Sequence, residues 1–224
     1  MKSPIVDTNG PITLLGGSKV ETGVLDLALG YAPNLVAADG GARAALGLGL
    51  IPQAVIGDFD SVDAATIAQI PKTRLHRISE QNSTDFEKCL RQISAAYILA
   101  VGFTGRRLDH ELAVYNALTR HLDQPCIVLG EVDLCFLVTE EVRLELPVGA
   151  RVSLFAMAPC RVTATGLRWP VEGKLMAPDG QIGTSNVASG GEVTVQVSAP
   201  KLLMILPLEF LGEVVSALTV GDSA

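Results

Sequence analysis

Between residues 12 and 129, short apolar runs alternate with stretches of helical periodicity. The apolar runs are residues 12–15, 35–38, 54–56, 75–78, 97–101 and 127–129. Runs of this length without alternating polar positions predict strands that are buried on both faces. The stretches between them predict helices at residues 21–29, 42–48, 62–70, 86–93 and 110–122. Strand–helix alternation is typical of a parallel sheet covered by helices.

The helix expected at residues 86–93 carries the most local detail. Phe86, Leu90 and Ile93 follow the spacing i, i+4, i+7 of one helix face. Thr84 and Glu87 have the spacing of a capping box, so we expect the helix to begin directly after Thr84.

The pattern changes after about residue 133. Strand-like segments follow one another at residues 134–138, 142–146, 152–157, 161–164, 193–197 and 202–206, separated by Gly- and Pro-containing turns. The next helical pattern is in the tail, at residues 208–218. We therefore predict an N-terminal parallel-sheet α/β (Rossmann-like) domain, residues 1–133, and a small all-β sandwich or barrel, residues 134–224.

Composition narrows the possible functions. The chain has 224 residues and a net charge of −7, from 17 basic and 24 acidic residues, and only 4% of its residues are aromatic. It therefore lacks the basic surface and the stacking rings that nucleic-acid binding requires. The four cysteines have no metal-ligand spacing and sit in apolar surroundings, which indicates small buried hydrophobic residues. With no signal segment and no apolar run near 20 residues, we expect a cytoplasmic protein without a membrane partner.

Acidic residues gather in the loops that follow predicted strands. The four loops are Asp39-Gly40-Gly41, Gly57-Asp58-Phe59-Asp60-Ser61, Glu80-Gln81-Asn82-Ser83-Thr84-Asp85 and Thr104-Gly105-Arg106-Arg107-Leu108-Asp109-His110. The carboxyl ends of parallel strands share one sheet edge, so these loops are expected to meet in one crevice. Clustered carboxylates repel one another unless a cation joins them, and hard oxygen ligands favour Mg²⁺.

We expect Asp58, Asp60 and Asp85 to face such an ion, with Arg106, Arg107 and Lys88 as donors to phosphate. Metal-binding carboxylates together with basic phosphate donors indicate a reaction on a polyphosphate that is bound through the metal ion.

Each loop also has a purely structural interpretation. Asp before Gly is ordinary turn chemistry, Thr84 and Asp85 can simply cap a helix, and an Arg pair beside Asp can be a surface ion pair. Neither a GxxxxGK[ST] phosphate loop nor a GxGxxG helix start is present. We favour one shared site, because the structural interpretation requires all four loops to carry these residues independently of one another.

Taken in order, these motifs resemble the thiamine pyrophosphokinase family. The resemblance rests on Ala38-Asp39-Gly40-Gly41, Gly57-Asp58-Phe59-Asp60-Ser61, Thr84-Asp85-Phe86-Glu87-Lys88 and Arg107-Leu108-Asp109-His110, and it continues with Gly166-Leu167-Arg168-Trp169 and Thr184-Ser185-Asn186. It implies transfer of pyrophosphate from ATP to the hydroxyl of thiamine, with release of AMP, by a Mg²⁺-dependent homodimer whose active site lies at the subunit interface.

The resemblance also implies roles for single residues. Asp58, Asp60 and Asp85 would hold Mg²⁺, while Gln81, Thr84, Lys88 and Arg107 would contact phosphates and Asp39, Gly40, Gly41 and Asp109 would line the nucleotide site. Asp58, Asp60, Asp85, Arg107 and Asp109 would form the catalytic set, with the general base open among Asp58, Asp60 and Asp109. Ser185 and Asn186 would hold thiamine, and Trp169 is either a further thiamine contact or a core tryptophan.

One residue departs from the family pattern. Arg106 stands where the family usually has a second glycine, so we expect either crowding at a position of close approach or a phosphate contact from Arg106 instead of Arg107. Two other functions remain open: a pyrophosphokinase for another hydroxymethyl heterocycle such as a pterin, and a non-catalytic nucleotide- or thiamine-binding regulator.

Overall fold

The computed structural model describes residues 3–220, and their contacts divide into two compact units. The first unit runs to Ala117 and includes Asp123–Glu131. The second consists of Leu118–Leu122 and the chain from Val132 onward.

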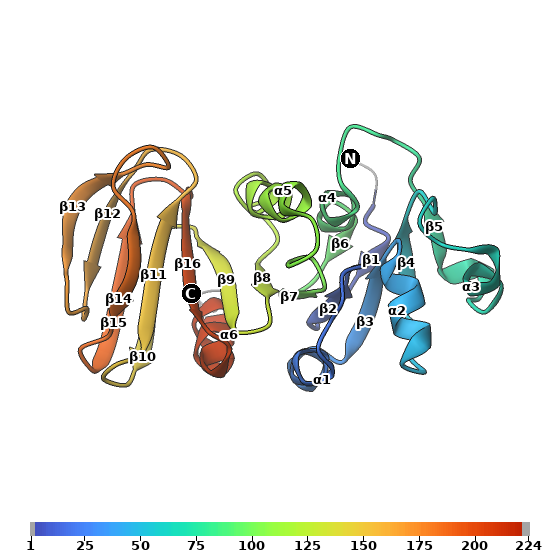
Figure 1. Ribbon diagram of the computed structural model, residues 1–224, viewed down its shortest axis with the longest axis horizontal. Helices are drawn as coiled ribbons and strands as arrows, with labels where there is room; N and C mark the ends of the chain where they lie inside the picture. Colours follow the sequence, from blue (N-terminus) through green and yellow to red (C-terminus); the bar gives the residue numbers. More distant parts are fainter. Residues whose placement is uncertain (1–2, 221–224) are drawn as a thin grey trace. The chain divides into compact units, whose positions relative to one another are not determined.

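A parallel sheet forms the centre of the first unit (Figure 1). Its strands are β2 (Ile12–Leu15), β3 (Asn34–Ala38), β4 (Ala54–Gly57), β5 (Leu75–Arg77), β7 (Ile98–Val101) and β8 (Cys126–Leu129). Their order in the sheet is β8-β7-β2-β3-β4-β5, and every pairing between them is parallel. The six predicted strands are confirmed, and β2, β4, β7 and β8 are buried at every position.

Helices cover both faces of this sheet, because the chain fills the sheet in two directions from β2. The helices of this part of the chain are α1 (Thr22–Tyr31), α2 (Gly41–Gly47), α3 (Ala64–Ala68), the 3₁₀ turn η1 (Lys72–Arg74), α4 (Asp85–Leu90) and α5 (Leu108–Leu118). In Figure 1, α1 and α2 lie on one side of the sheet and α4 and α5 on the other. This is the arrangement that right-handed crossovers produce.

The predicted helix ends are wrong at three places. The helix expected at residues 110–122 spans Leu108–Leu118. The helix expected to reach Ile93 ends at Leu90, because the backbone of Ile93 pairs in parallel with Val6, as β6 (Ile93–Ser94) against β1 (Val6–Asp7). The helix expected at residues 62–70 spans only Ala64–Ala68, and its start is set by Asp63, which caps it by accepting a hydrogen bond from Thr66 N at 2.8 Å.

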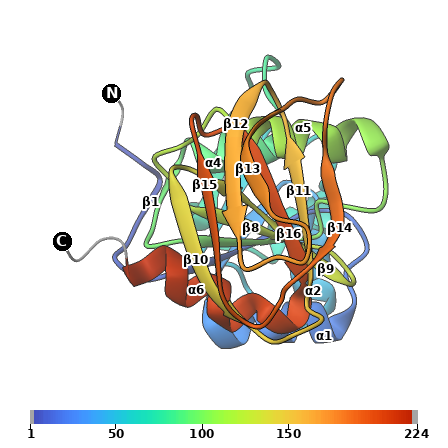
Figure 2. The ribbon, with the colours of Figure 1, turned by 90° about the vertical axis from the view of Figure 1, so that its left-hand side faces the viewer.

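The second unit is a sandwich of two antiparallel sheets (Figure 2). One sheet has the order β10-β15-β12-β13 and the other contains β14-β11-β16-β9. The strands are β9 (Asp133–Val138), β10 (Glu141–Leu146), β11 (Arg151–Ala156), β12 (Cys160–Thr165), β13 (Val171–Met176), β14 (Gly183–Val187), β15 (Gly191–Val197) and β16 (Leu202–Pro207), followed by η2 (Leu208–Phe210) and α6 (Leu211–Val220). Buried and exposed residues alternate strictly in β10 and β12, as expected for strands with one face on a core.

The predicted all-β second half and its tail helix are thus confirmed as a sandwich, but β13 and β14 are additions that the hydrophobic pattern did not predict. All four cysteines are free and buried, as predicted. Within residues 3–220, no helix has both the length and the apolar character to cross a membrane.

Candidate active site

A cavity of about 290 Å³ opens in the first unit at the carboxyl ends of the central strands. Its walls come from the loops after β2, β3, β4, β5 and β7 and from the first turns of α2 and α5. The neighbours β2 and β7 are the point at which the sheet order changes direction, and open α/β sheets bind ligands at such a point. The predicted convergence of strand-end loops is therefore present in the structure.

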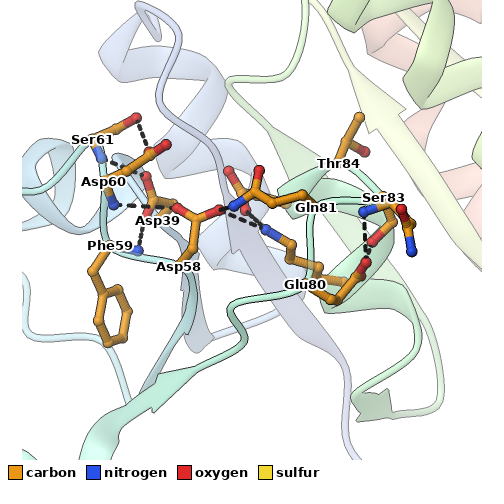
Figure 3. Close-up of polar contacts among 12 residues, drawn as sticks. Asp39, Asp58, Phe59, Asp60, Ser61, Glu80, Gln81, Ser83 and Thr84 are labelled. Atoms are coloured by element: carbon orange, nitrogen blue, oxygen red, sulfur yellow. Dashed lines mark hydrogen bonds and ion pairs between the residues drawn. The ribbon is translucent and has the colours of Figure 1, made fainter.

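Three carboxylates meet at one side of this region (Figure 3). Asp39, Asp58 and Asp60 each place one oxygen so that these atoms lie within 4.8 Å of one another. Asp39 follows β3, whereas Asp58 and Asp60 follow the neighbouring strand β4. A set of oxygen donors from carboxylates alone is the kind of site that suits a hard divalent cation. Asp85, which the sequence grouped with Asp58 and Asp60, is not a member of this trio.

Asp39 holds the Asp58–Ser61 loop in place. It is buried, and its Oδ1 accepts a hydrogen bond from Phe59 N at 2.8 Å while its Oδ2 accepts one from Ser61 N at 3.3 Å. Both Asp39 and Phe59 have left-handed backbones, with φ of 40° and 66°. A Cβ at Gly57 would lie 2.8 Å from the Asp39 Cβ, so this approach requires glycine. Burial, reinforced by the charge of Asp85, raises the pKa of the Asp39 carboxyl.

Lys88 is the internal counter-ion of the acidic loops. Its side chain is only 2% exposed, and its Nζ lies 2.9 Å from Asp58 Oδ2 and 2.9 Å from Asp85 Oδ1. The hydrogen bond from Lys88 lowers the pKa of the Asp58 carboxyl. Burial alone would lower the pKa of Lys88, but its hydrogen bonds to Asp58 and Asp85 raise it overall. The ammonium expected to contact phosphate thus bridges two carboxylates in this structure.

The loop between β5 and α4 brings a further group to Asp58. Gln81 Nε2 donates to Asp58 Oδ2 at 3.3 Å, and Figure 3 shows its side chain directed at that carboxylate. Glu80 braces the loop, since it accepts from Ser83 Oγ and from Asn82 N. These bonds lower the pKa of Glu80 to about 2, and the hydrogen bond from Ser83 has the largest effect. Thr84 caps α4 by accepting from Glu87 N at 3.3 Å, which confirms the predicted N-cap.

Arginines contribute to the walls of the cavity. Arg107 forms two hydrogen bonds with Asp109, at 3.1 and 2.6 Å, which raise the pKa of Arg107 and lower that of Asp109. Arg106 reaches Gly17 O with one long hydrogen bond of 3.4 Å. The left-handed position in this loop belongs to Gly105, at φ 79°, and the exposed Arg106 side chain is accommodated without the expected crowding. Arg106 therefore makes fewer hydrogen bonds within the protein than Arg107 and is the more available donor for a phosphate.

The two glycines after Asp39 have different surroundings. Gly40 lines the cavity, whereas Gly41 packs against the β2 strand end, where a Cβ would meet Leu15 O at 2.0 Å. Gly41 thus positions the start of α2 and does not itself line the cavity.

The thiamine-contact candidates all lie in the second unit. Ser185 and Asn186 are on the edge strand β14, Ser185 exposed and Asn186 buried. Trp169 lies in the loop between β12 and β13 and is 54% exposed, so its interpretation as a core tryptophan is wrong. Arg168 stacks over its ring at 5.0 Å from the centroid.

Sequence reasoning missed several cavity residues. Arg43 lines the cavity from the first turn of α2, and Ser18 lines it from the loop after β2. Phe103 also lines it and packs edge-on against Phe86, with ring centroids 4.9 Å apart. The loop after β2 could have been found by the same strand-end criterion that identified the other four, whereas Arg43 carries no such local signal.

Comparison with known families matches both halves of the chain. The thiamin pyrophosphokinase catalytic domain matches residues 26–129, and the thiamin pyrophosphokinase vitamin B1 binding domain matches residues 139–202. Thiamine pyrophosphokinase 2 of Oryza sativa subsp. japonica is 31% identical over 175 residues, covering 69% of this chain and 65% of the relative. Thiamine pyrophosphokinase 1 of Arabidopsis thaliana is 26% identical, with the same two coverages. The match thus spans just under two thirds of the relatives' length.

Solved structures show the same fold. Thiamin pyrophosphokinase from Candida albicans superimposes with a TM-score of 0.75 at 16% identity, covering 92% of this chain and 95% of that chain. Yeast thiamin pyrophosphokinase gives a TM-score of 0.72 at 15% identity, covering 94% and 89%. At these identities, the likeness supports the fold alone.

Proposed function

The chain belongs to the thiamin pyrophosphokinase family, and from that premise we propose that it transfers the pyrophosphoryl group of ATP to the hydroxyl of thiamine. The products are thiamine diphosphate and AMP. The observation that carries this proposal is the carboxylate trio Asp39, Asp58 and Asp60 beside a cavity with arginines in its wall, at the switch point of a parallel sheet. The match to the vitamin B1 binding domain supports thiamine as the acceptor.

The trio fits a magnesium ion by the chemistry of its donors. Asp39, Asp58 and Asp60 can each supply one carboxylate oxygen, and their mutual repulsion favours a bound cation. Magnesium, when bound, would offset the negative charge of the ATP phosphates. Asp85 remains a further proposed ligand, for which the lysine bridge through Lys88 would have to open.

The reaction requires one bond to form and one to break. The thiamine hydroxyl oxygen attacks the β-phosphorus, the bond from that phosphorus to the bridging oxygen breaks, and AMP leaves with the bridging oxygen and the electron pair. We propose that Arg106 and Arg43 bind phosphate oxygens, since Arg107 is committed to Asp109.

The hydroxyl proton needs an acceptor. Asp58 and Asp109 both have lowered pKa values, which makes them weaker bases. Asp58 and Asp109 are also occupied by ion pairs with Lys88 and Arg107. We therefore propose Asp60 as the acceptor on its position, because it is exposed in the same trio and its hydrogen-bond partner is the neutral Ser61 Oγ, at 2.9 Å.

An AMP-release assay with ATP, Mg²⁺ and thiamine tests this function. Wild type should release AMP only with thiamine present, and Asp60→Ala should lose at least roughly a hundredfold in kcat. Asp26→Ala removes an exposed carboxylate from α1 and is the matched control. A folded wild type that releases no thiamine-dependent AMP contradicts the proposal, and release that follows a pterin alcohol instead identifies the alternative acceptor.

We further propose a homodimer in which the β-sandwich of one subunit completes the site on the α/β unit of the other. At thiamine concentrations well below the KM, mixed dimers of Asp60→Ala and Trp169→Ala chains should then regain part of the kcat/KM that each variant lacks alone. Failure of the mixture to regain activity, with dimers shown by sedimentation, contradicts a shared site. The four free, buried cysteines support work in a reducing compartment, which we propose is the cytoplasm.

A further inference from the structure

Trp169, the only tryptophan of the chain, is held at the surface by backbone contacts on both sides of its loop. Arg168 N donates to Val187 O at 2.8 Å, and Ser189 N donates to Gly166 O at 2.8 Å. A large aromatic side chain that is 54% exposed gains little from burial, so its position depends on such contacts.

Asn186 makes the closest of these contacts with its side chain. The Oδ1 accepts from Trp169 N at 3.2 Å and from Val187 N at 2.8 Å, and the Nδ2 donates to Trp169 O at 2.7 Å. One amide thus binds the backbone of Trp169 at both its N–H and its carbonyl. Because Asn186 is 6% exposed and its carbonyl oxygen already accepts two hydrogen bonds, little capacity is left for a substrate.

The residue before Asn186 has an unusual backbone. Ser185 has φ of 59°, a left-handed conformation that costs a non-glycine residue free energy. Its N–H donates to the buried Ser153 Oγ at 3.0 Å, so the conformation is fixed from the neighbouring strand β11. Ser153 therefore fixes the backbone of Ser185. Asn186, the next residue on β14, in turn binds the backbone of Trp169.

We propose that Asn186 is a positioning residue for the acceptor substrate, which acts by fixing Trp169 as a rigid aromatic surface, and that it does not bind the substrate itself. The inference rests on the proposed function, because the surface is assigned to the thiamine cation. Arg168 over one ring face shows that this indole accepts a flat cation. Because a guanidinium lies over that face and the side chain is 54% exposed, the proposal assigns the opposite face to the positively charged thiazolium.

Kinetics separate positioning from direct binding. Asn186→Ala should raise the KM for thiamine roughly tenfold, while kcat and the KM for ATP change less than about threefold. Trp169→Ala should raise the same KM by a similar factor, and the double variant should be no worse than Trp169→Ala alone. Asn34→Ala is the matched control, because Asn34 also donates from its amide to a backbone carbonyl, Pro11 O, but in the first unit.

Fluorescence gives a readout that does not depend on catalysis, because all tryptophan emission comes from Trp169. In the wild type, emission anisotropy should be that of a fixed indole, and thiamine without nucleotide should quench it. In Asn186→Ala the anisotropy should fall and acrylamide quenching should rise, with neither change in Asn34→Ala. Unchanged anisotropy in a folded Asn186→Ala, or additive losses in the double variant, overturns the proposal.

A measurement on the wild type covers the case in which Asn186→Ala does not fold. The chain has five asparagines, so selective ¹⁵N-asparagine labelling gives few side-chain amide signals. The Asn186 NH₂ signal should be protected from hydrogen exchange before thiamine is added, and addition should leave that protection in place. A freely exchanging amide that becomes protected only with thiamine shows direct binding and overturns the proposal.

Failure of the two proposals can be told apart. If wild type makes thiamine diphosphate but Asn186→Ala changes neither the KM for thiamine nor the emission, only the positioning role is wrong. If Asn186→Ala frees Trp169 but the wild type neither binds thiamine nor releases AMP with it, the substrate assignment is wrong in both.

Discussion

Replacing Lys88 with methionine tests the charge balance of the acidic loops. The variant keeps the buried aliphatic stem but removes the ammonium that lies 2.9 Å from both Asp58 and Asp85. Removing one partner of a fully buried ion pair costs about 3–5 kcal/mol. Here the two carboxylates are 12% and 34% exposed, so water replaces part of the lost interaction. We therefore expect a loss of about 2–3 kcal/mol in the free energy of unfolding near neutral pH.

The pH dependence of that loss has a defined sign. The hydrogen bond from Lys88 holds the folded-state pKa of Asp58 below its ordinary value of 3.8. The stabilisation is therefore complete above about pH 4 and is lost as the pH falls through the lowered pKa. The difference between wild type and Lys88→Met should accordingly shrink in acid.

Urea unfolding in metal-free buffer at pH 7 and at several pH values below 4 measures both effects. Lys72→Met, at an exposed position in η1, is the control and should change stability by less than about 0.5 kcal/mol. A Lys88→Met variant within about 0.5 kcal/mol of wild type at pH 7 would refute the argument, as would a difference that grows on acidification.

Three further changes probe separate parts of the site. Hydrogen bonds from Ser83 and its loop lower the Glu80 pKa to about 2, so they stabilise the fold fully above about pH 4.5 and lose that effect as the pH falls towards 2. Glu80→Gln should remove this stabilisation, and the urea midpoints of wild type and variant should therefore converge between about pH 4.5 and 2. Gly41→Ala places a Cβ 2.0 Å from Leu15 O, so thermal unfolding should show a loss of at least about 2 kcal/mol. Arg106→Gly should raise the KM for ATP by about five- to twentyfold and leave the KM for thiamine unchanged in steady-state assays; an unchanged KM for ATP would exclude Arg106 as a phosphate ligand.

The fold could be predicted where a strand is buried, because burial requires apolar residues along that strand. Strands buried on both faces of a parallel sheet consist of continuous apolar runs, and this signal holds fully for β2, β4, β7 and β8. The edge strand β5 (Leu75–Arg77) was also predicted, although none of its three residues is buried. The signal fails at the sheet edges of the second unit. In β13 (Val171–Met176) only the two end residues are buried, and β14 (Gly183–Val187) is mostly polar. These segments are strands because they pair with neighbouring strands. A local sequence pattern does not show such pairing.

The site was predictable to the level of loops but not of atoms. Strand-end topology brings the acidic loops to one cavity, as expected. It does not show that Asp85 would bind Lys88 while Asp39 joins Asp58 and Asp60. That difference depends on hydrogen bonds between residues about 20 positions apart, such as Phe59 N to Asp39 Oδ1. Side-chain partners at that separation cannot be inferred from spacing along the chain.

Asp39 links the shape of the site to its charge. Its two oxygens each accept a backbone N–H from the Asp58–Ser61 loop, so the residue that fixes this loop also stands in the carboxylate trio. Burial raises the pKa of Asp39, and the charge of Asp85 adds to that effect, so an ionised Asp39 is costly here without a nearby cation. Lys88 forms ion pairs with Asp58 and Asp85, whereas within residues 3–220 it forms none with Asp39 or Asp60. Of the carboxylate trio, Asp39 is the member that lines the cavity, so a divalent cation delivered with a polyphosphate would relieve its charge.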